Sequence, residues 1–232
     1  MMARTIVILL VVTAASLATL NALTFAEAPG DKQQPSAAPR QSRPFPPTDL
    51  GLLETPDRAA WQQPELIMDA LQIAYGDTVA DVGAGSGFFT VRLARRVGPN
   101  GVVYAEDIQQ PMLESIKRRV NREGLKNVVT RLGTATDTKL PKGALDAVLV
   151  VDVYQDVGDE GSRIRLLRHL ADTLKPQGRI GIVNYKPGEG GPGPEPQGRL
   201  DRAVVEAEVG AAGLRVLQRI TLPFQYLLVA GR

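Results

Sequence analysis

Three glycines at alternate positions have a spacing that could form a ligand-binding turn. Gly83, Gly85 and Gly87 follow a short apolar run and lead directly into a stretch with apolar residues every three or four positions. Glycine adopts backbone conformations that other residues avoid, and it lets a ligand touch the main chain. A helix that begins there would offer free N–H groups and a partial positive charge. The turn is therefore the first candidate for a small-molecule site.

An acidic pair follows this glycine turn. Glu106 and Asp107 end a second apolar run, and an acid about 20 residues past such a turn can accept hydrogen bonds from both hydroxyls of a ribose. The dinucleotide-binding fingerprint requires Gly or Ala where this chain has Phe88, because helix and strand pack closely there. No Gly-Lys-Ser/Thr sequence follows the turn, which excludes the phosphate cradle of a P-loop.

Alternating short and long apolar patterns indicate the elements that position these residues. We expect strands over 78–82, 102–105, 128–132, 145–151 and 180–183, and helices over 64–73, 89–97, 111–123, 164–174 and 200–212. This alternation indicates a parallel sheet with helices on both faces. The last two apolar runs, 214–220 and 224–230, are separated by three residues. So short a connection cannot hold a crossover helix, so we expect them to pair antiparallel.

Further motifs complete an ordered set. They are the stretch 104–108 with 111–113, the loop 133–137, the apolar run 145–150 and the sequence 174–179. Together with the glycine turn, this set resembles the class I S-adenosylmethionine-dependent methyltransferases over nearly all of residues 49–232. The resemblance implies an α/β fold with a Rossmann-like seven-stranded, mostly parallel sheet that ends in an antiparallel hairpin.

The resemblance also implies a cofactor, S-adenosylmethionine, and roles by position. The glycine turn would hold its methionine portion, Asp107 its ribose, and Asp137 its adenine amino group. Asp152 would line the side of the sulfonium. From position alone, Asp137 is alternatively a loop cap and Asp152 a strand-end cap. The full set of implied cofactor-binding residues is Asp81, Gly83, Gly85, Gly87, Asp107, Ile108, Met112, Thr136, Asp137 and Asp152.

Catalytic residues are harder to assign, because methyl transfer from a sulfonium mainly needs alignment and exclusion of water. A general base is needed only if the acceptor must lose a proton. The candidates are Tyr154, Asp156 and Tyr185, which follow the fourth and fifth expected strands, where ligands of open α/β sheets bind. We favour Tyr154, with a plain wall residue as the alternative. Similar methyltransferases often have histidines after this tyrosine, and Gln155 and Asp156 replace them here.

Two further segments flank the expected site. Residues 58–64, which include Trp61, resemble a stretch that caps the cofactor in similar proteins. Trp61 is equally a candidate for the core. Residues 186–196 are rich in Gly and Pro, and we interpret them as either a mobile lid over the acceptor or a disordered loop.

The first 48 residues differ in composition from the rest. Arg4 and a nearly continuous apolar run over 6–23 predict a signal peptide over 1–26. The alternative is an uncleaved anchor through residues 5–23, because about 18 apolar residues can span a bilayer. Both place the rest of the chain outside the cytoplasm, as a periplasmic, secreted or membrane-anchored protein. Residues 27–48 are rich in Pro and predict a flexible linker, which leaves 49–232 as the methyltransferase domain.

The overall composition excludes several functions. The chain has no cysteine and one histidine, which rules out thiolate catalysis and a cysteine- or histidine-rich metal centre. Its 27 basic and 25 acidic residues leave a net charge of +2, which is no footprint for nucleic acid. The basic clusters at 92–96 and 117–122 have helical spacing, and we interpret them as solvated helix faces. We therefore expect neither a metal nor a nucleic-acid partner.

These observations favour an S-adenosylmethionine-dependent methyltransferase that acts on a small molecule, with a lipid-like or quinone-like acceptor as the finer hypothesis. The alternative is a non-catalytic exported nucleoside-binding protein that retains the fold. A nicotinamide-dependent oxidoreductase is disfavoured by Phe88 and by the terminal hairpin. The sequence identifies neither the acceptor, nor the oligomeric state, nor a source of cofactor outside the cytoplasm.

Overall fold

The computed structural model describes residues 45–188 and 190–232. The targeting segment expected over 1–26 and most of the linker expected over 27–48 lie outside the described residues. The described part begins its regular structure with a 3-10 helix, η1 (Pro47–Leu53), two residues before the expected domain start. Proline suits this position because its fixed φ matches the first turn of a helix. No helix of the described part is long and apolar enough to cross a membrane.

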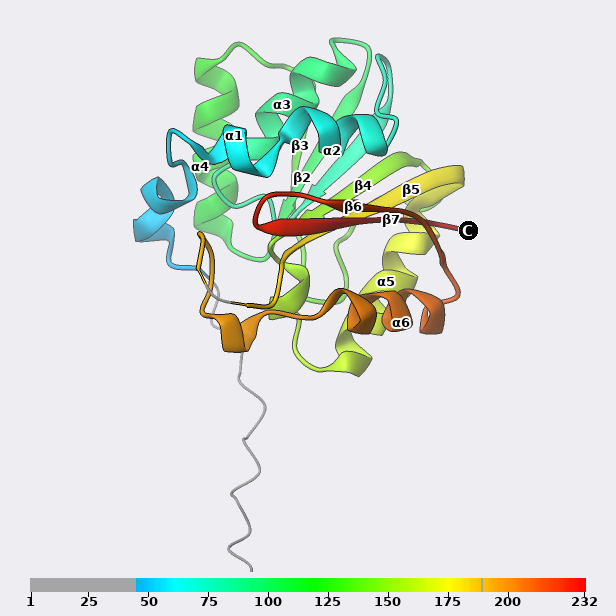
Figure 1. Ribbon diagram of the computed structural model, residues 1–232. Helices are drawn as coiled ribbons and strands as arrows, with labels where there is room; N and C mark the ends of the chain where they lie inside the picture. Colours follow the sequence, from blue (N-terminus) through cyan, green and yellow to red (C-terminus); the bar gives the residue numbers. More distant parts are fainter. Residues whose placement is uncertain (1–44, 189) are drawn as a thin grey trace, which may run out of the picture. The chain divides into compact units, whose positions relative to one another are not determined.

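A seven-stranded sheet forms the centre of the fold (Figure 1). The strands are β1 (Thr78–Val82), β2 (Val102–Asp107), β3 (Val128–Leu132), β4 (Leu145–Val151), β5 (Leu174–Tyr185), β6 (Arg215–Thr221) and β7 (Gln225–Gly231). Their order in the sheet is β3-β2-β1-β4-β5-β7-β6. The first five strands are parallel, and β7 is antiparallel to both β5 and β6. The expected Rossmann-like sheet with its antiparallel hairpin is therefore confirmed.

Helices cover both faces of the sheet (Figure 1). They are α1 (Arg58–Gln62), α2 (Pro64–Ala70), α3 (Phe88–Val97), α4 (Gln110–Arg122), α5 (Glu160–Thr173) and α6 (Arg202–Ala211), with short 3-10 helices η2 (Tyr154–Asp156) and η3 (Pro196–Gly198). Strand β4 shows the consequence: Ala147 and Leu149 pack with α2 and α3, whereas Val148 and Val150 pack with α5 and α6. A strand buried on both faces reads as a continuous apolar run.

The structure differs from the expected elements mainly around α5. This helix begins at Glu160, before the expected residue 164, because the Asp159 side chain accepts a hydrogen bond from the N–H of Ser162 at 2.8 Å and caps the first turn. Residues 175–178, which lie between the expected helix over 164–174 and the expected strand over 180–183, belong to β5, which follows α5 without a loop. The register of β5 against β4 shifts there, between Leu145 and Ala147. Helix α1 was not expected.

The strand order determines where a ligand can bind. The chain continues outward from β1 to β2 and β3 on one side, and from β4 to β5 on the other. Connections that leave neighbouring strands in opposite directions open a crevice at their carboxyl ends. In this fold that crevice lies beyond Val82 of β1 and Val151 of β4.

Candidate functional site

One cavity of about 840 Å³ lies over the carboxyl ends of β1, β2 and β4. It extends from the glycine turn at residues 83–87 past Asp107 and continues to Asp152, Tyr185 and Trp61. Its volume lies within the roughly 300–1,000 Å³ typical of small-molecule sites. The glycine turn therefore lies in the crevice that the strand order predicts.

The glycine turn forms the first wall of this cavity. Gly83, Gly85 and Gly87 have φ angles of 68°, 52° and 79°, the left-handed region that glycine adopts without strain. Below the turn, Asp81 Oδ2 accepts a hydrogen bond from the Thr90 hydroxyl at 2.6 Å, which ties β1 to α3. Burial raises the pKa of Asp81 to about 6, against the effect of that hydrogen bond. Asp81 thus supports the turn and also lines the cavity.

Asp107 ends β2 beside the turn. Its Oδ2 accepts the N–H of Gly85 at 2.9 Å, and its Oδ1 accepts the N–H of Gln109 at 2.9 Å. Burial raises the pKa of Asp107, and these backbone N–H groups oppose the rise. Each carboxylate oxygen has a second lone pair, so the fixed carboxylate can still accept hydrogen bonds from a ligand. Ile108 and Met112 line the same end of the cavity.

Glu106 is a buried acid with an incomplete set of partners. The side chain is 2% exposed, it lines the cavity, and among the described residues its Oε1 has no hydrogen-bond partner. Burial, and then the neighbouring charge of Asp107, raise its pKa to about 8. A Cβ on Gly133 would overlap Oε1, which explains a glycine at that point of the chain.

The loop after β3 places two of the expected cofactor-binding residues outside the cavity. Thr136 and Asp137 do not line the cavity. An antiparallel bridge between Thr134 and Asp137 closes a tight turn, and the Asp137 carboxylate pairs instead with Lys139 at the surface. The residues of this loop that line the cavity are Thr134, Ala135 and Thr138.

Asp152 follows β4 and has an unusual backbone. Its φ is 59°, which is uncommon for any residue other than glycine and is often found at functional sites. Its side chain accepts two amide hydrogen bonds: Gln225 Nε2 donates to Oδ1 at 2.5 Å, and Gln62 Nε2 donates to Oδ2 at 3.1 Å. Burial raises the pKa of Asp152 to about 7, although the Arg58 charge and the two amides oppose the rise.

These contacts belong to a larger polar network. Arg58 Nε donates to Gln62 Oε1 at 2.6 Å, and Gln62 Nε2 also donates to Gln225 Oε1 at 3.1 Å. The side chains of Gln62 and Gln225 are fully buried. Arg58, Gln62, Gln225 and Asp152 come from α1, β7 and the end of β4, so the network joins distant parts of the chain at the cavity wall.

An aromatic wall lies next to this network. The Trp61 ring lies 6.2 Å from that of Tyr185 and 6.1 Å from that of Phe224, tilted to the first and edge-on to the second. Pro192 and Pro194 line the cavity on the same side. This part of the cavity is therefore suited to a flat, apolar group.

The described residues of the Gly/Pro-rich loop wrap around one guanidinium group. Arg199 donates hydrogen bonds to four backbone oxygens of the segment 186–194. They belong to Pro194 at 2.9 Å, Lys186 at 3.2 Å, Gly190 at 3.3 Å and Pro192 at 3.3 Å. A single side chain thus holds this part of the acceptor-side wall.

Tyr154, the favoured catalytic candidate, does not line the cavity. Its side chain is fully buried, and its hydroxyl donates to Glu208 at 2.6 Å. Glu208 in turn pairs with Arg163 at 2.5 Å. Helix η2 directs the ring toward α5 and α6 rather than over the sheet, so Tyr154 is a core residue. The other two candidates, Asp156 and Tyr185, do line the cavity, and burial raises the pKa of Asp156 to about 6.

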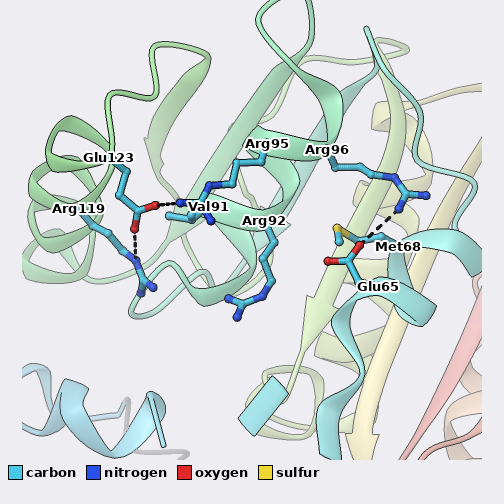
Figure 2. A pocket seen from close by; sticks show the side chains of 8 residues that line it. All are labelled: Glu65, Met68, Val91, Arg92, Arg95, Arg96, Arg119 and Glu123. Carbon is cyan, nitrogen blue, oxygen red and sulfur yellow. Dashed lines mark hydrogen bonds and ion pairs between the residues drawn. The ribbon is translucent and has the colours of Figure 1, made fainter. Parts of the chain in front are cut away.

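A second hollow of about 460 Å³ lies between α2, α3 and α4 (Figure 2). We call it the arginine hollow; it is lined by Glu65, Met68, Val91, Arg92, Arg95, Arg96, Arg119 and Glu123. Arg95 pairs with Glu123 at 2.6 Å, and Arg96 contacts Glu65 at 3.5 Å. The basic cluster at 92–96, expected as a solvated helix face, is thus largely engaged in ion pairs. Arg92 instead lies 3.6 Å from the centre of the Phe88 ring.

Sequence reasoning missed Gln62, Gln225 and Glu106. The two glutamines belong to no recognisable local motif. Glu106 was noted as the neighbour of Asp107, but the ribose-binding role was given to Asp107 alone. Arg58 and Trp61 were noted only as members of a capping segment. In the described ranges 45–188 and 190–232, no group of three or more acidic or histidine side chains could hold a metal ion.

Comparisons with known proteins find methyltransferases. A family model described as a methyltransferase domain matches residues 79–178. Nocamycin O-methyltransferase of Saccharothrix syringae is 32% identical over 52% of this chain and 42% of its own length. Demethylmenaquinone methyltransferase of Symbiobacterium thermophilum is 36% identical over 45% of this chain and 41% of its own length. The chain therefore spans less than half the length of these curated relatives.

Among solved structures, a SAM dependent methyltransferase from Aquifex aeolicus has a TM-score of 0.75 and 28% identity, and covers 80% of this chain and 98% of that one. Geranyl diphosphate C-methyltransferase from Streptomyces coelicolor, solved with S-adenosyl-L-homocysteine, has a TM-score of 0.62. At 21% identity over 77% of this chain and 82% of its own, it is similar in fold alone.

Proposed function

We propose that the chain is a class I S-adenosylmethionine-dependent methyltransferase, and that it transfers a methyl group from S-adenosylmethionine to a small, largely apolar acceptor with a quinone-like ring. The observation that carries this proposal is the continuity of the cavity. A single space of about 840 Å³ joins the glycine turn and Asp107 to the aromatic wall. A cofactor and a small acceptor can therefore meet without bulk water between them.

The residues at one end of the cavity fit the cofactor. Asp107 offers free lone pairs to ribose hydroxyls, and Ile108 and Met112 offer apolar surface to a base. Arg58 lines the cavity near the turn and is suited to the carboxylate of the methionine portion. The bound cofactor would supply a methyl group on a positively charged sulfur, and the protein would align the acceptor with it.

The other end of the cavity supports the proposed class of acceptor. Trp61, Tyr185 and the prolines of the loop offer a flat apolar surface, and Asp152 and Asp156 offer acceptors for hydroxyl groups. A hydroxylated ring, such as a reduced quinone, matches both kinds of group. Two curated relatives, named for nocamycin and for demethylmenaquinone, are consistent with such an acceptor.

We further propose that residues 1–26 direct the protein out of the cytoplasm, as a cleaved signal or as an anchor through residues 5–23. The support is the apolar run that follows Arg4. N-terminal sequencing of protein recovered from a fractionated cell tests this proposal. A mature N-terminus near residue 27 indicates cleavage, an intact Met1 in the membrane fraction indicates an anchor, and an intact Met1 in the cytoplasm contradicts both.

Calorimetry and a transfer assay test the proposed activity. We expect the purified protein to bind S-adenosylhomocysteine and S-adenosylmethionine but not NADH. With a labelled methyl group, we expect transfer to 1,4-dihydroxynaphthalene, a reduced naphthoquinone. No affinity for either nucleoside would contradict the proposal. Nucleoside binding without transfer to naphthols, to reduced quinones or to an envelope lipid extract would favour the non-catalytic alternative.

A further inference from the structure

Asp152 lies where the cofactor end and the acceptor end of the cavity meet. The side chain is half-buried and lines the cavity. The segment that holds it lies tightly against the glycine turn, because a Cβ on Gly83 would overlap the side chain of Val153. Val153, the next residue, thus packs on the turn, while the Asp152 carboxylate faces Tyr185 of the aromatic wall.

The two glutamines fix the orientation of this carboxylate. Each of its oxygens accepts one amide N–H, at 2.5 Å from Gln225 and at 3.1 Å from Gln62. The Gln62 carbonyl oxygen is held in turn by Arg58 at 2.6 Å. Because a carboxylate can accept about four hydrogen bonds, lone pairs remain for a group in the cavity. Such a connected network holds a side chain more firmly than isolated bonds do.

Two residues of this region have left-handed backbones, Asp152 with φ 59° and Gln63, next to Gln62, with φ 52°. Such conformations cost about 1–3 kcal/mol each and cluster where function requires them. Neither residue is a glycine, so the chain tolerates strain on both sides of the hydrogen-bonded pair. The strain is consistent with a carboxylate that must be placed accurately.

We propose that Asp152 is the proton acceptor of the transfer reaction, that Gln62 and Gln225 are the positioning residues that aim its carboxylate, and that the acceptor is therefore methylated on a hydroxyl oxygen. This inference rests on the proposed function and deepens it, because it names the acceptor atom.

The step balances in atoms and charge. The acceptor O–H bond breaks and its proton moves to an Asp152 carboxylate oxygen. The hydroxyl oxygen forms a bond to the methyl carbon, and the C–S bond breaks with its electron pair left on sulfur. A cationic sulfonium, a neutral alcohol and an anionic carboxylate thus become a neutral thioether, a methyl ether and a neutral carboxylic acid. No further oxidant or reductant is required.

The charged and titratable groups around Asp152 suit this role. Burial raises its pKa to about 7, while Arg58 and the two amides lower it and Asp156 raises it. A general base works best when its pKa lies near the working pH. Tyr185 faces Asp152, and burial together with that carboxylate raises the pKa of Tyr185 above its ordinary range. Tyr185 therefore stays protonated and is not itself a base.

A first experiment compares Asp152→Asn with a matched surface control, Asp172→Asn. The probe acceptor is 1-naphthol. We expect Asp152→Asn to lower kcat by about 10²-fold or more, the usual contribution of a general base. Asp172→Asn should leave kcat within twofold. S-adenosylhomocysteine should bind all three proteins with dissociation constants within about threefold, which separates a lost base from a lost cofactor site.

A second experiment needs no turnover. 4-Nitrophenol changes colour on ionisation, so its apparent pKa can be measured while it is bound to the cofactor-free protein. A carboxylate opposite the phenol disfavours a second anion. We therefore expect the bound phenol to have a higher apparent pKa in the wild type than in Asp152→Asn. Equal values would mean that Asp152 does not face the acceptor hydroxyl.

The positioning role has its own test. Gln225→Leu removes a hydrogen bond that lowers the pKa of Asp152, so the acidic limb of the kcat/KM profile should move to higher pH. If Gln225 only stabilised the fold, Gln225→Leu would lower the stability of the protein but leave the acidic limb of the profile at the same pH. The double variant D152N/Q225E keeps an amide–carboxylate contact but transfers the charge to β7. We expect it to melt close to the wild type and to remain as slow as Asp152→Asn.

The outcomes separate the two proposals. If the wild type binds S-adenosylhomocysteine and methylates 1-naphthol, but Asp152→Asn retains full kcat and an unchanged pH profile, the role of Asp152 is contradicted and the proposed function stands. If methyl transfer yields only C-methylated naphthol, the assignment of the acceptor atom is wrong. If the wild type binds no nucleoside, the proposed function itself is contradicted.

Discussion

The arginine hollow and the cavity differ in how their charged groups are satisfied. In the arginine hollow, Arg95 and Arg96 pair with carboxylates of neighbouring helices. In the cavity, Glu106 leaves one oxygen without a partner in the described structure, and Asp152 is held in a left-handed backbone. Five cavity carboxyl groups have a raised pKa, those of Asp81, Glu106, Asp107, Asp152 and Asp156.

This difference shows where to look for function. Paired arginines and glutamates at a surface satisfy one another and need no ligand. The left-handed backbone of Asp152, an unpartnered buried oxygen and several carboxyl groups with raised pKa values lie in one cavity. Together they contradict the usual rules of a stable fold. Such violations concentrate at functional sites. The number of arginines that line a hollow is therefore a weaker guide to function than the number of buried polar groups without a hydrogen-bond partner.

Of the substitutions that test this contrast, we expect the one at Asp107 to have the largest effect. We expect Asp107→Lys to weaken binding of S-adenosylhomocysteine by about 10²-fold or more, because hydrogen bonds to a charged group contribute about 1.5–3 kcal/mol each. It also removes the carboxylate that holds the N–H of Gly85. Calorimetry measures the change. An unchanged dissociation constant would show that the cavity does not use this acid.

A second test concerns the stability cost of the cavity. The pKa of Glu106 is raised to about 8 by burial, so between pH 4.5 and 8 the folded state keeps a proton that the unfolded state releases. Stability therefore falls as pH rises through this window. We expect the stability of Glu106→Gln to fall less steeply with pH, so that the variant gains about 4 kcal/mol relative to the wild type at pH 8.

Urea unfolding from pH 5 to 8 measures this linkage. The slope should decrease without vanishing in Glu106→Gln, because Asp81, Asp152 and Asp156 also have raised pKa values. Parallel pH profiles for the variant and the wild type would indicate that Glu106 is ionised in the folded protein.

A third test addresses the aromatic wall. We expect Trp61→Ala to lower kcat/KM for 1-naphthol by about 10-fold, since contacts between aromatic rings contribute roughly 0.5–1.5 kcal/mol beyond burial. Its affinity for S-adenosylhomocysteine should change less than twofold, because Trp61 lies on the acceptor side. A larger loss of cofactor affinity would identify Trp61 as a cofactor cap instead.

The smallest effect is expected in the arginine hollow. The side chain of Arg95 is 64% exposed, and an exposed ion pair contributes little. We expect Arg95→Gln to change the free energy of unfolding by less than about 0.5 kcal/mol and to leave kcat unchanged. A marked loss of methyl transfer in this variant would break the contrast between the two hollows.

Features encoded within one stretch of chain could be predicted from the sequence. The glycine turn and Asp107 were found because strand, turn and acid follow one another at a fixed spacing. The β4 run was clear because burial on both faces leaves a continuous apolar pattern. The hairpin of β6 and β7 followed from a connection too short for a crossover.

Features that depend on side-chain direction or on distant contacts could not. Tyr154 was misplaced because a residue just past a strand can turn to either face, and only the buried Glu208 on α6 shows which. For Asp137 the sequence left a cofactor contact and a loop cap open, and only the contact with Lys139 shows that its carboxylate lies at the surface. The Gln62–Asp152–Gln225 contacts join residues separated by 90, 73 and 163 positions, and no local pattern reports such a meeting.

Strand β7 has a consequence for how the protein folds. It is the last strand along the described chain, yet it lies inside the sheet, between β5 and β6. The amide that holds Asp152 Oδ1 is at its first residue, Gln225. A nascent chain that has emerged only as far as β6 therefore lacks both the strand that joins β6 to β5 and the amide that holds Asp152. The sheet and the hydrogen bonds around Asp152 are completed together, when residues 225–231 insert.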